Sequence, residues 1–401
     1  MTVSIIVPIY HGKTYIPNLI YQAEKNAEHV PGELELLLVN DDPEELFNEQ
    51  WNSASIQIRV IHTDRNRGIH GARMRGLTHA AGEFVLFLDQ DDRIEPDYMK
   101  KQLRAIGKAA AVVCKAWENQ KIYYHGDRLL KECIRKDCMT QKGNFIISPG
   151  QVLLRKKEIP EFWKANILKH NGADDWFLWL CMLCEGKRIA CNEELLFDHR
   201  VHGENASANG FSMLNSMSEM YRKLKENRDC TKKDLIGIRN VIKRQEIHYL
   251  KERDKLLELY ALLNDWMELR EQGNSIADYI QKQGYKKVFI YGKGPVGLRL
   301  ARELQAHQTE VCSFIDRDAQ ALQEGIPAIL PEEVKDMPEP VYITLAKSQA
   351  EEVMKQLKEK GIKEVYLLSD IIRKLRQEMD AGGIEAEGKR DNDQSKKQDG
   401  F

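Results

Sequence analysis

The feature that most constrains the fold is an alternation of apolar, strand-like runs with helical segments, which starts at the N-terminus. Strand-like runs cover residues 3–9, 34–39, 56–61 and 84–88, and helical segments cover residues 16–28 and 71–81. Strands and helices in this order predict an α/β sheet with helices on both faces. Further short apolar runs and a Trp-rich segment between residues 143 and 202 complete the same domain.

A different pattern begins near Thr231. Neither Gly nor Pro occurs between Ile238 and Gln272, and apolar residues recur at alternating spacings of three and four. This predicts a long helix with a heptad stripe, which is interrupted at Gln245 and Glu252. Two arrangements stay open. The helix packs against the chain's own domains, or it pairs with a second copy as a coiled coil and makes the protein a homodimer.

The overall composition excludes a general affinity for nucleic acid. The chain has 60 basic and 62 acidic side chains and a formal net charge of −2, so it lacks the field that attracts nucleic acid. A hydrophobic share of 42% and a charged share of 30% are typical of a soluble globular protein. The N-terminus has no basic lead-in, and no run approaches the roughly 18 apolar residues of a membrane span. We expect a cytoplasmic protein that can make peripheral contact with the inner face of the cell membrane.

Cys181 and Cys184 form a C-x-x-C pair, one of the spacings found in zinc sites. The pair lies in the apolar segment 176–184, which predicts a buried helix, and no second C-x-x-C completes four ligands. We therefore interpret these cysteines as reduced thiols that pack in the core.

Carboxylates cluster directly after two of the predicted strands. Asp41 and Asp42 follow the second strand, and Asp89, Asp91 and Asp92 follow the strand at residues 84–88. Open parallel sheets bind ligands at the carboxyl ends of their strands. An Asp-x-Asp pair there can present two carboxylates to a hard divalent cation, which in turn can neutralise a diphosphate. A solvated acidic turn is the alternative interpretation, because so short a motif is common.

The surroundings of these carboxylates resemble a known family. Motifs at residues 4–10, 38–41, 66–76 and 82–92 occur in the order seen in family 2 glycosyltransferases. The chain resembles that family over residues 1–210. The resemblance implies a GT-A catalytic domain that inverts the anomeric centre as it transfers a sugar from a nucleotide-diphosphate donor, expected to be a UDP-sugar. It also implies a hydroxyl of a glycan or glycolipid as acceptor, Mn²⁺ or Mg²⁺ as cofactor, and a role in bacterial cell-surface polysaccharide synthesis.

The resemblance assigns roles to residues at the ends of the first strands. Pro8 and Tyr10 would lie in the nucleotide pocket, and Asp41 would contact the base, where a carboxylate can accept the uracil ring N–H. Asp89 would face the ribose and the metal ion. Asp91 would be the principal metal ligand.

Further positions carry over with some departures from the family pattern. Arg73 would lie near the diphosphate or brace the acidic loop, which we define as residues 89–92. His202, in an Arg-x-His segment, would complete the metal shell. Asp42 and Pro43 stand where the family usually has Gly-Ser, and Met74 replaces the usual Asn.

Residues 171–176 look like the family's Glu-Asp-Trp segment on the acceptor side. Asp174 stands at the Glu position and Asp175 at the Asp position. An inverting transfer needs a carboxylate that takes the proton of the acceptor hydroxyl, and we expect Asp175 to be that base. A cap pair for the helix that follows is the alternative, and it is compatible with the catalytic role.

A second α/β unit follows the long helix, with strand-like runs at residues 287–291, 310–315, 341–345 and 364–368. Gly292, Gly294 and Gly297 satisfy G-x-G-x-x-G between a strand and a helix, and Asp316 ends the next strand. This pattern favours a Rossmann-like domain with a second nucleotide site. A tight turn kept for packing alone is equally compatible with it.

Together these patterns predict four parts. They are a GT-A domain over residues 1–210, a helical connector over 211–283, a Rossmann-like domain over 284–378 and a disordered tail over 379–401.

Two other enzyme classes stay open. A nucleotidyltransferase would share the sheet and the acidic site, although the first strand lacks the expected Gly-rich, Arg-containing loop, and an NAD-dependent oxidoreductase could use the C-terminal unit.

Overall fold

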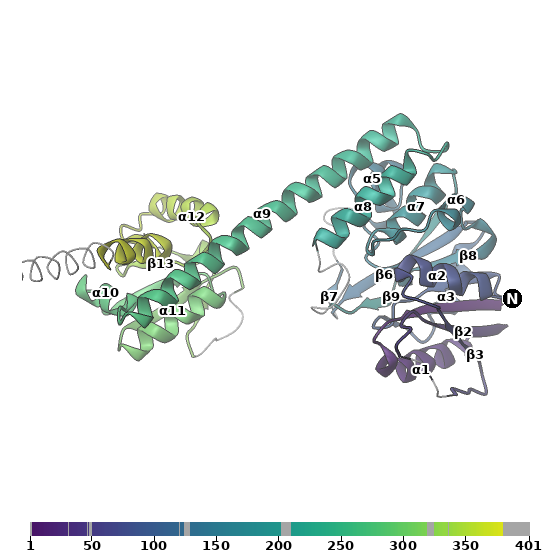
Figure 1. Cartoon of the computed structure of the whole chain (residues 1–401), viewed down its shortest axis with the longest axis horizontal. Helices are drawn as coiled ribbons and strands as arrows, with labels where there is room; N and C mark the ends of the chain where they lie inside the picture. The colour runs from purple at the N-terminus through teal and green to yellow at the C-terminus, as the bar shows by residue number, and fades with distance from the viewer. Residues whose placement is uncertain are drawn as a thin grey trace, which may run out of the picture. The chain divides into compact units, whose positions relative to one another are not determined.

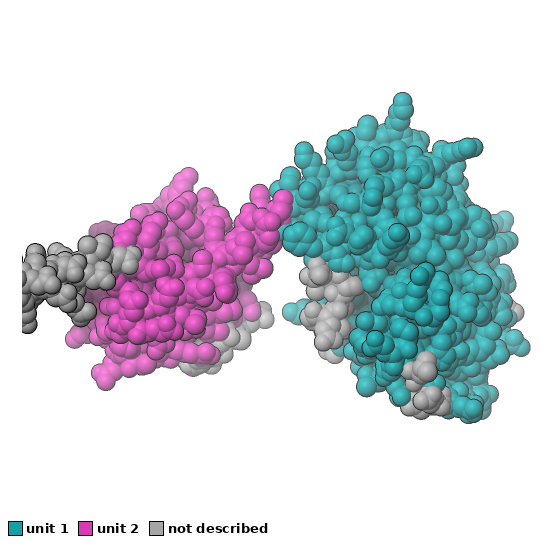
Figure 2. All heavy atoms as spheres, in the orientation of Figure 1, with its two compact units in different colours: residues 1–249 teal, residues 250–401 magenta. Residues whose placement is uncertain are grey.

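The chain divides into two compact units, residues 1–249 and 250–401 (Figure 2). The structure is a computed structural model. It describes residues 2–30, 32–45, 47, 50–119, 121–123, 129–201, 210–318, 325–335 and 337–379. Residues 380–401, which make up nearly all of the predicted tail, lie outside this description.

Unit 1 is built on a mixed sheet with the strand order β3-β2-β1-β4-β8-β6-β9-β5, with β7 paired to β6 (Figure 1). The strands are β1 (Thr2–Ile9), β2 (Glu33–Asn40), β3 (Gln57–His62), β4 (Phe84–Phe87), β5 (Arg93–Ile94), β6 (Ala111–Glu118), β7 (Lys121–Ile122), β8 (Val152–Arg155) and β9 (Ile189–His199). The first four pair in parallel, as their order along the chain predicts, and β8 runs antiparallel between β4 and β6.

Helices cover both faces of this sheet, as predicted. They are α1 (Ile16–Ala27), α2 (Gly68–His79), α3 (Tyr98–Ile106), α4 (Leu130–Cys133), α5 (Lys136–Gln141), α6 (Glu161–Ala165), α7 (Asp174–Cys184) and α8 (Gly210–Leu224). Because successive side chains of a strand point to opposite faces, Ile6 of β1 packs with α2 and α7 while Ile5 packs with α1 and α3. Cys181 is fully buried in the first of these cores, which confirms its packing role.

The parallel register brings the ends of the first strands to one edge of the sheet. Ile9 at the end of β1 pairs with Asn40 at the end of β2, and Ile6 pairs with Phe87 at the end of β4. The loops after these three strands therefore start side by side, and they carry the carboxylates singled out in the sequence.

The long helix α9 (Lys232–Glu271) begins in unit 1 and ends in unit 2. Ile238 and Val241 are buried in the core of unit 1, and Trp266 and Leu269 are buried in the core of unit 2. Packing against the chain's own units is thus confirmed at both ends of the helix. The homodimer stays a prediction.

Unit 2 contains a parallel sheet with the strand order β12-β11-β10-β13-β14. Its strands are β10 (Lys287–Tyr291), β11 (Glu310–Ile315), β12 (Ala328–Ile329), β13 (Val341–Ile343) and β14 (Val365–Leu367). Its helices include α10 (Ile276–Lys282), α11 (Pro295–Ala306) and α12 (Lys347–Glu359), and residues 368–379 are helical as well. Strand β12 was not predicted, because two residues are too few to show a period. Within the described residues of both units, every helix falls short of the length and apolar composition that crossing a membrane requires.

Candidate active site

The loops after β1 and β4 are joined by a pair of hydrogen bonds. The backbone N–H of Tyr10 donates to Oε1 of Gln90 at 3.1 Å, and Nε2 of Gln90 donates to the carbonyl of Tyr10 at 3.2 Å. Pro8 is partly buried within β1, whereas the side chain of Tyr10 is exposed. Gln90 thus holds the loop after β1 against the acidic loop after β4. Gln90 lies inside the acidic run, but the sequence pattern did not predict a role for it.

Asp41 lies in a buried position directly after β2. Its Oδ1 accepts hydrogen bonds from Oγ1 of Thr63 at 3.0 Å and from the backbone N–H of Arg67 at 2.9 Å. Burial raises the pKa of the Asp41 carboxyl, and these hydrogen bonds partly offset that effect. The carboxyl group is therefore held in one orientation by residues of the loop before α2.

A buried guanidinium joins two parts of the chain that are far apart in sequence. Arg73 on α2 is 3% exposed, contacts Oδ1 of Asp89 at 2.5 Å, and also forms an ion pair with Asp174 at the start of α7. Burial opposes the charge of Arg73, but the two carboxylates outweigh it and raise its pKa. Arg73 thus contacts the loop that carries Asp89, and its position near a diphosphate stays a prediction.

Asp175 follows Asp174 and has a different environment. Its Oδ2 accepts a hydrogen bond from Nδ2 of Asn144 at 3.0 Å, and its Oδ1 accepts one from the backbone N–H of Trp176 at 2.6 Å. Burial, and then the neighbouring charge of Asp174, raise the pKa of Asp175 to about 7. A carboxyl with that pKa can take up and release a proton near neutral pH. The N-cap of α7 is Ala173, so both aspartates lie in the first helical turn and not at the cap position.

Asp92 is a residue of this site that the sequence analysis left without a role. It is fully buried, accepts a hydrogen bond from Oγ of Ser148 at 2.7 Å, and pairs with Nδ1 of His199 at 2.9 Å. Burial raises the pKa of Asp92 to about 6, and the contact with His199 acts in the opposite direction. Asp92 therefore ties the acidic loop to the end of β9. Its place in the run that starts at Asp89 was a signal that could have identified it.

The donor set of the acidic loop suits a hard divalent cation. Asp89 and Asp91 both offer carboxylate oxygens, the ligands that Mg²⁺ and Mn²⁺ prefer. Oδ1 of Asp89 contacts the guanidinium of Arg73, and Oγ of Ser148 lies 3.5 Å from Oδ2 of Asp89. His202, the third predicted ligand, lies outside the described residues.

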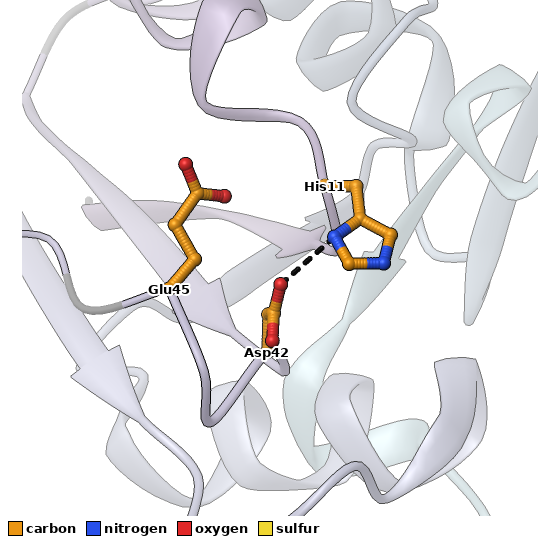
Figure 3. Close-up of side chains that lie close together, drawn as sticks. All are labelled: His11, Asp42 and Glu45. Carbon is orange, nitrogen blue, oxygen red and sulfur yellow. Dashed lines mark ion pairs between the residues drawn. The ribbon is translucent and has the colours of Figure 1, made fainter.

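A second group of ligand-type side chains lies beside Asp41. His11, Asp42 and Glu45 each offer one atom within 4.8 Å of the others, and Nδ1 of His11 lies 2.9 Å from Oδ2 of Asp42 (Figure 3). Asp42 is buried, and His11 has a positive φ of 49°. This group can bind a divalent cation through one nitrogen and two carboxylates. Asp42 departs from the family pattern at this position, and that departure was the available sequence signal.

In unit 2 the glycine-rich turn adopts a compact form. Gly292 has a φ of 102°, and a Cβ on Gly297 would lie 2.0 Å from the carbonyl oxygen of Gly292. The backbone N–H of Lys293 donates to Oδ2 of Asp316 at 2.7 Å. The structure thus brings the turn and Asp316 together, and close packing accounts for Gly292 and Gly297. A Cβ on Gly294 would meet open space.

Comparisons with known proteins agree on the class to which the first unit is similar. The family model Glycosyl transferase family 2 matches residues 4–160. The Bacillus subtilis (strain 168) protein "Putative glycosyltransferase EpsH" is 34% identical over 116 residues, which are 28% of this chain and 33% of that protein. "Putative teichuronic acid biosynthesis glycosyltransferase TuaG" of the same organism is 24% identical over 229 residues, which are 55% of this chain and 88% of that protein.

A solved structure, that of S. aureus TarS 1–349, aligns with 62% of this chain and 72% of its own at 17% identity and a TM-score of 0.44. Residues 4–160 of the first unit are thus similar to glycosyl transferase family 2, by the match of the family model.

Proposed function

We propose that unit 1 is an inverting glycosyltransferase that moves a sugar from a nucleotide-diphosphate donor to a hydroxyl group of a glycan or glycolipid. The observation that carries this proposal is the position of Asp175. This carboxyl, with its pKa raised to about 7, lies next to an ion-paired cluster in which Arg73 links Asp174 to the acidic loop. The family match over residues 4–160 supports the same reaction class.

In the proposed reaction Asp175 acts as the general base. Its carboxylate takes the proton of the acceptor hydroxyl while that oxygen forms a bond to the anomeric carbon. The bond from the anomeric carbon to the diphosphate oxygen breaks on the opposite side, which inverts the configuration, and the nucleoside diphosphate leaves with the electron pair. Asn144 donates a hydrogen bond to Oδ2 of Asp175 at 3.0 Å and orients the base.

The leaving group requires neutralisation of its charge. A bound Mn²⁺ or Mg²⁺ supplies this as a Lewis acid, and Asp91 and Asp89 are the residues proposed to hold it. Arg73 keeps Asp89 in place, since its guanidinium contacts that carboxylate at 2.5 Å while it is itself fixed by Asp174. His202 remains a proposed further ligand.

The donor is proposed to be a UDP-sugar. Asp41 would accept the N–H of the uracil ring, because its carboxyl is held in one orientation by Thr63 and Arg67. Pro8 and Tyr10 would line the rest of the nucleotide pocket. The name of one relative, which includes teichuronic acid biosynthesis, supports a bacterial cell-surface polysaccharide as the product. We further propose that the protein acts at the inner face of the cell membrane.

The decisive experiment is a donor screen followed by transfer assays. Purified protein is incubated with a panel of nucleotide sugars with Mn²⁺, with Mg²⁺ or with chelator, and release of nucleoside diphosphate is measured. Asp91→Asn and Asp175→Asn are then compared with the wild type on the donor that is turned over. If both variants keep wild-type transfer, the assignment of the site is wrong.

For unit 2 we propose a second nucleotide site at Gly292, Gly294, Gly297 and Asp316. Support comes from the open space above Gly294 and from the hydrogen bond that places Asp316 against the turn. NADH fluorescence and thermal shifts with a panel of nucleotides test this proposal, with Gly294→Val as the variant that fills the open space. If no nucleotide binds, the turn serves packing alone.

A further inference from the structure

Unit 1 contains a large cavity that the proposed reaction does not use. Its volume is about 810 Å³. Three segments form its walls: α4 with α5, the connection from α7 to β9, and the first turn of α9 (elements labelled in Figure 1, except α4). A volume of this size is within the range of small-molecule sites, roughly 300–1,000 Å³.

The lining of this cavity is strongly basic. Six cationic side chains and two carboxylates, those of Asp137 and Asp234, line it, and a third carboxylate, that of Glu185, pairs with one of the cations, which leaves an excess of three positive charges. The six are Lys131, Arg135, Lys136, Lys187, Arg188 and Lys233. The chain as a whole has a net charge of −2, so this concentration is a local feature. It creates a positive potential that favours an anion.

Half of these cations already have a carboxylate partner. Lys136 pairs with Asp234 at 2.8 Å, Arg135 with Asp137 at 3.1 Å, and Lys187 with Glu185 at 2.8 Å. The other three are Lys131, Arg188 and Lys233, and each comes from a different wall. All three are exposed, and among the residues that the structure describes none of them takes part in an ion pair.

The neutral polar side chains that line the cavity already donate hydrogen bonds within the chain. Oγ1 of Thr231 donates to Oδ2 of Asp234 at 2.7 Å, Oγ1 of Thr140 to the carbonyl of Asp137 at 3.4 Å, and Nε2 of Gln141 to the carbonyl of Lys233 at 3.4 Å. The three cations are therefore the groups that a ligand would pair with. The amino end of α9 carries a partial positive charge, and the carboxylate of Asp234 in its first turn, which accepts from the backbone N–H of Thr231 at 2.9 Å, already offsets part of it. A single carboxylate offers one charge and two oxygens, which leaves some of the three cations without a partner. A phosphate ester or diphosphate offers more charge and more acceptors.

The cavity lies at the other end of β9 from Asp92 and at the other end of α7 from Asp175. Leu183 lines it eight residues along α7 from Asp175, a separation of roughly 12 Å. Arg188 and Ile189 line it at the start of β9, whereas His199 at the other end of that strand contacts Asp92. Ten steps along a strand cover roughly 30 Å. A ligand in the cavity is therefore not the sugar donor in its reacting position.

We propose that this basic cavity is a binding site for a phosphoryl group, either on a soluble phosphate compound or on an anionic phospholipid head group. Lys131, Arg188 and Lys233 provide the charges that pair with it. The occupancy of this cavity can be measured without turnover.

The test uses two probes and two matched variants of the full chain, with chelator present. The probes are inorganic pyrophosphate, followed by calorimetry, and phosphatidylcholine vesicles with or without phosphatidylglycerol, followed by cosedimentation. The test variant carries K131Q, R188Q and K233Q. The control variant carries K100Q, K108Q and K121Q, which removes three exposed lysines elsewhere on unit 1.

We expect at least one probe to bind the wild type and the control variant, and to bind the test variant at least tenfold more weakly. Pyrophosphate binding identifies a soluble ligand, and binding only to vesicles with phosphatidylglycerol identifies a lipid head group. The proposal is overturned if neither probe binds the wild type, if the test variant binds as tightly as the wild type, or if both variants lose binding equally. Circular dichroism of both variants checks that they are folded.

Discussion

Replacing Asp175 with Asn should increase the stability of unit 1 while it removes the proposed catalytic base. The substitution removes the charge and preserves the size of the side chain and an oxygen that can accept from Asn144. The pKa of Asp175 is raised from 3.8 to about 7 by burial and by the neighbouring Asp174. The folded state therefore binds a proton that the unfolded state has released between these pH values, so stability falls as the pH rises from about 4 to about 7.

The size of this effect follows from the shift. A change of roughly 3 pKa units corresponds to about 4 kcal/mol at most, fully expressed above pH 7. Urea unfolding of the wild type and Asp175→Asn at pH 5 and pH 8 measures it. We expect the variant to be the more stable protein at pH 8 and the difference to shrink strongly at pH 5.

The activity should change in the opposite direction. Loss of a general base lowers kcat by roughly 10²- to 10⁴-fold, and wild-type kcat should rise with pH through about 7 as Asp175 loses its proton. Asp174→Asn is the matched control. It removes a partner of buried Arg73, so it should destabilise unit 1 at both pH values. The reasoning is refuted if Asp175→Asn gains no stability at pH 8, or if it transfers sugar at the wild-type rate.

Three further predictions concern other parts of the chain. Arg73→Met should cost about 3–5 kcal/mol in urea unfolding, since it leaves the buried carboxylate of Asp174 unpaired, and a loss below about 1 kcal/mol would contradict this. Gly297→Ala should lower the free energy of unfolding of unit 2 by about 1–3 kcal/mol or more, because its Cβ would lie 2.0 Å from a backbone oxygen. In the control Gly294→Ala the Cβ meets open space, so the free energy of unfolding should change far less. Equal effects of the two substitutions would show that the close approach is unimportant. Asp41→Ala should weaken UDP binding in calorimetry by roughly tenfold or more, through loss of a charged hydrogen-bond acceptor, and an unchanged Kd would remove Asp41 from the donor site.

Local patterns in the sequence predicted much of the fold. Apolar runs predicted β1, β2 and β10, the first two of which are buried on both faces, and the helical period of about 3.6 predicted α1, each to within one residue of its observed ends. The short strand β12 was not predicted, because two residues show no period. The long helix α9 was predicted from the absence of Gly and Pro, but the sequence did not say which residues of its stripe are buried. Only the two cores at its ends decide that.

The sequence by itself determined which carboxylates follow the strands, because a strand and the loop after it are neighbours in the chain. Tertiary structure decided how these groups act on one another. The contact of Arg73 with Asp174 spans 101 positions, and the pKa of Asp175 depends on burial and on charges brought in by other segments. The basic cavity likewise takes its three unpaired cations from three separate walls. Electrostatic interactions depend on distance and on exclusion of water, and the folded chain sets both quantities for residues that the sequence leaves far apart.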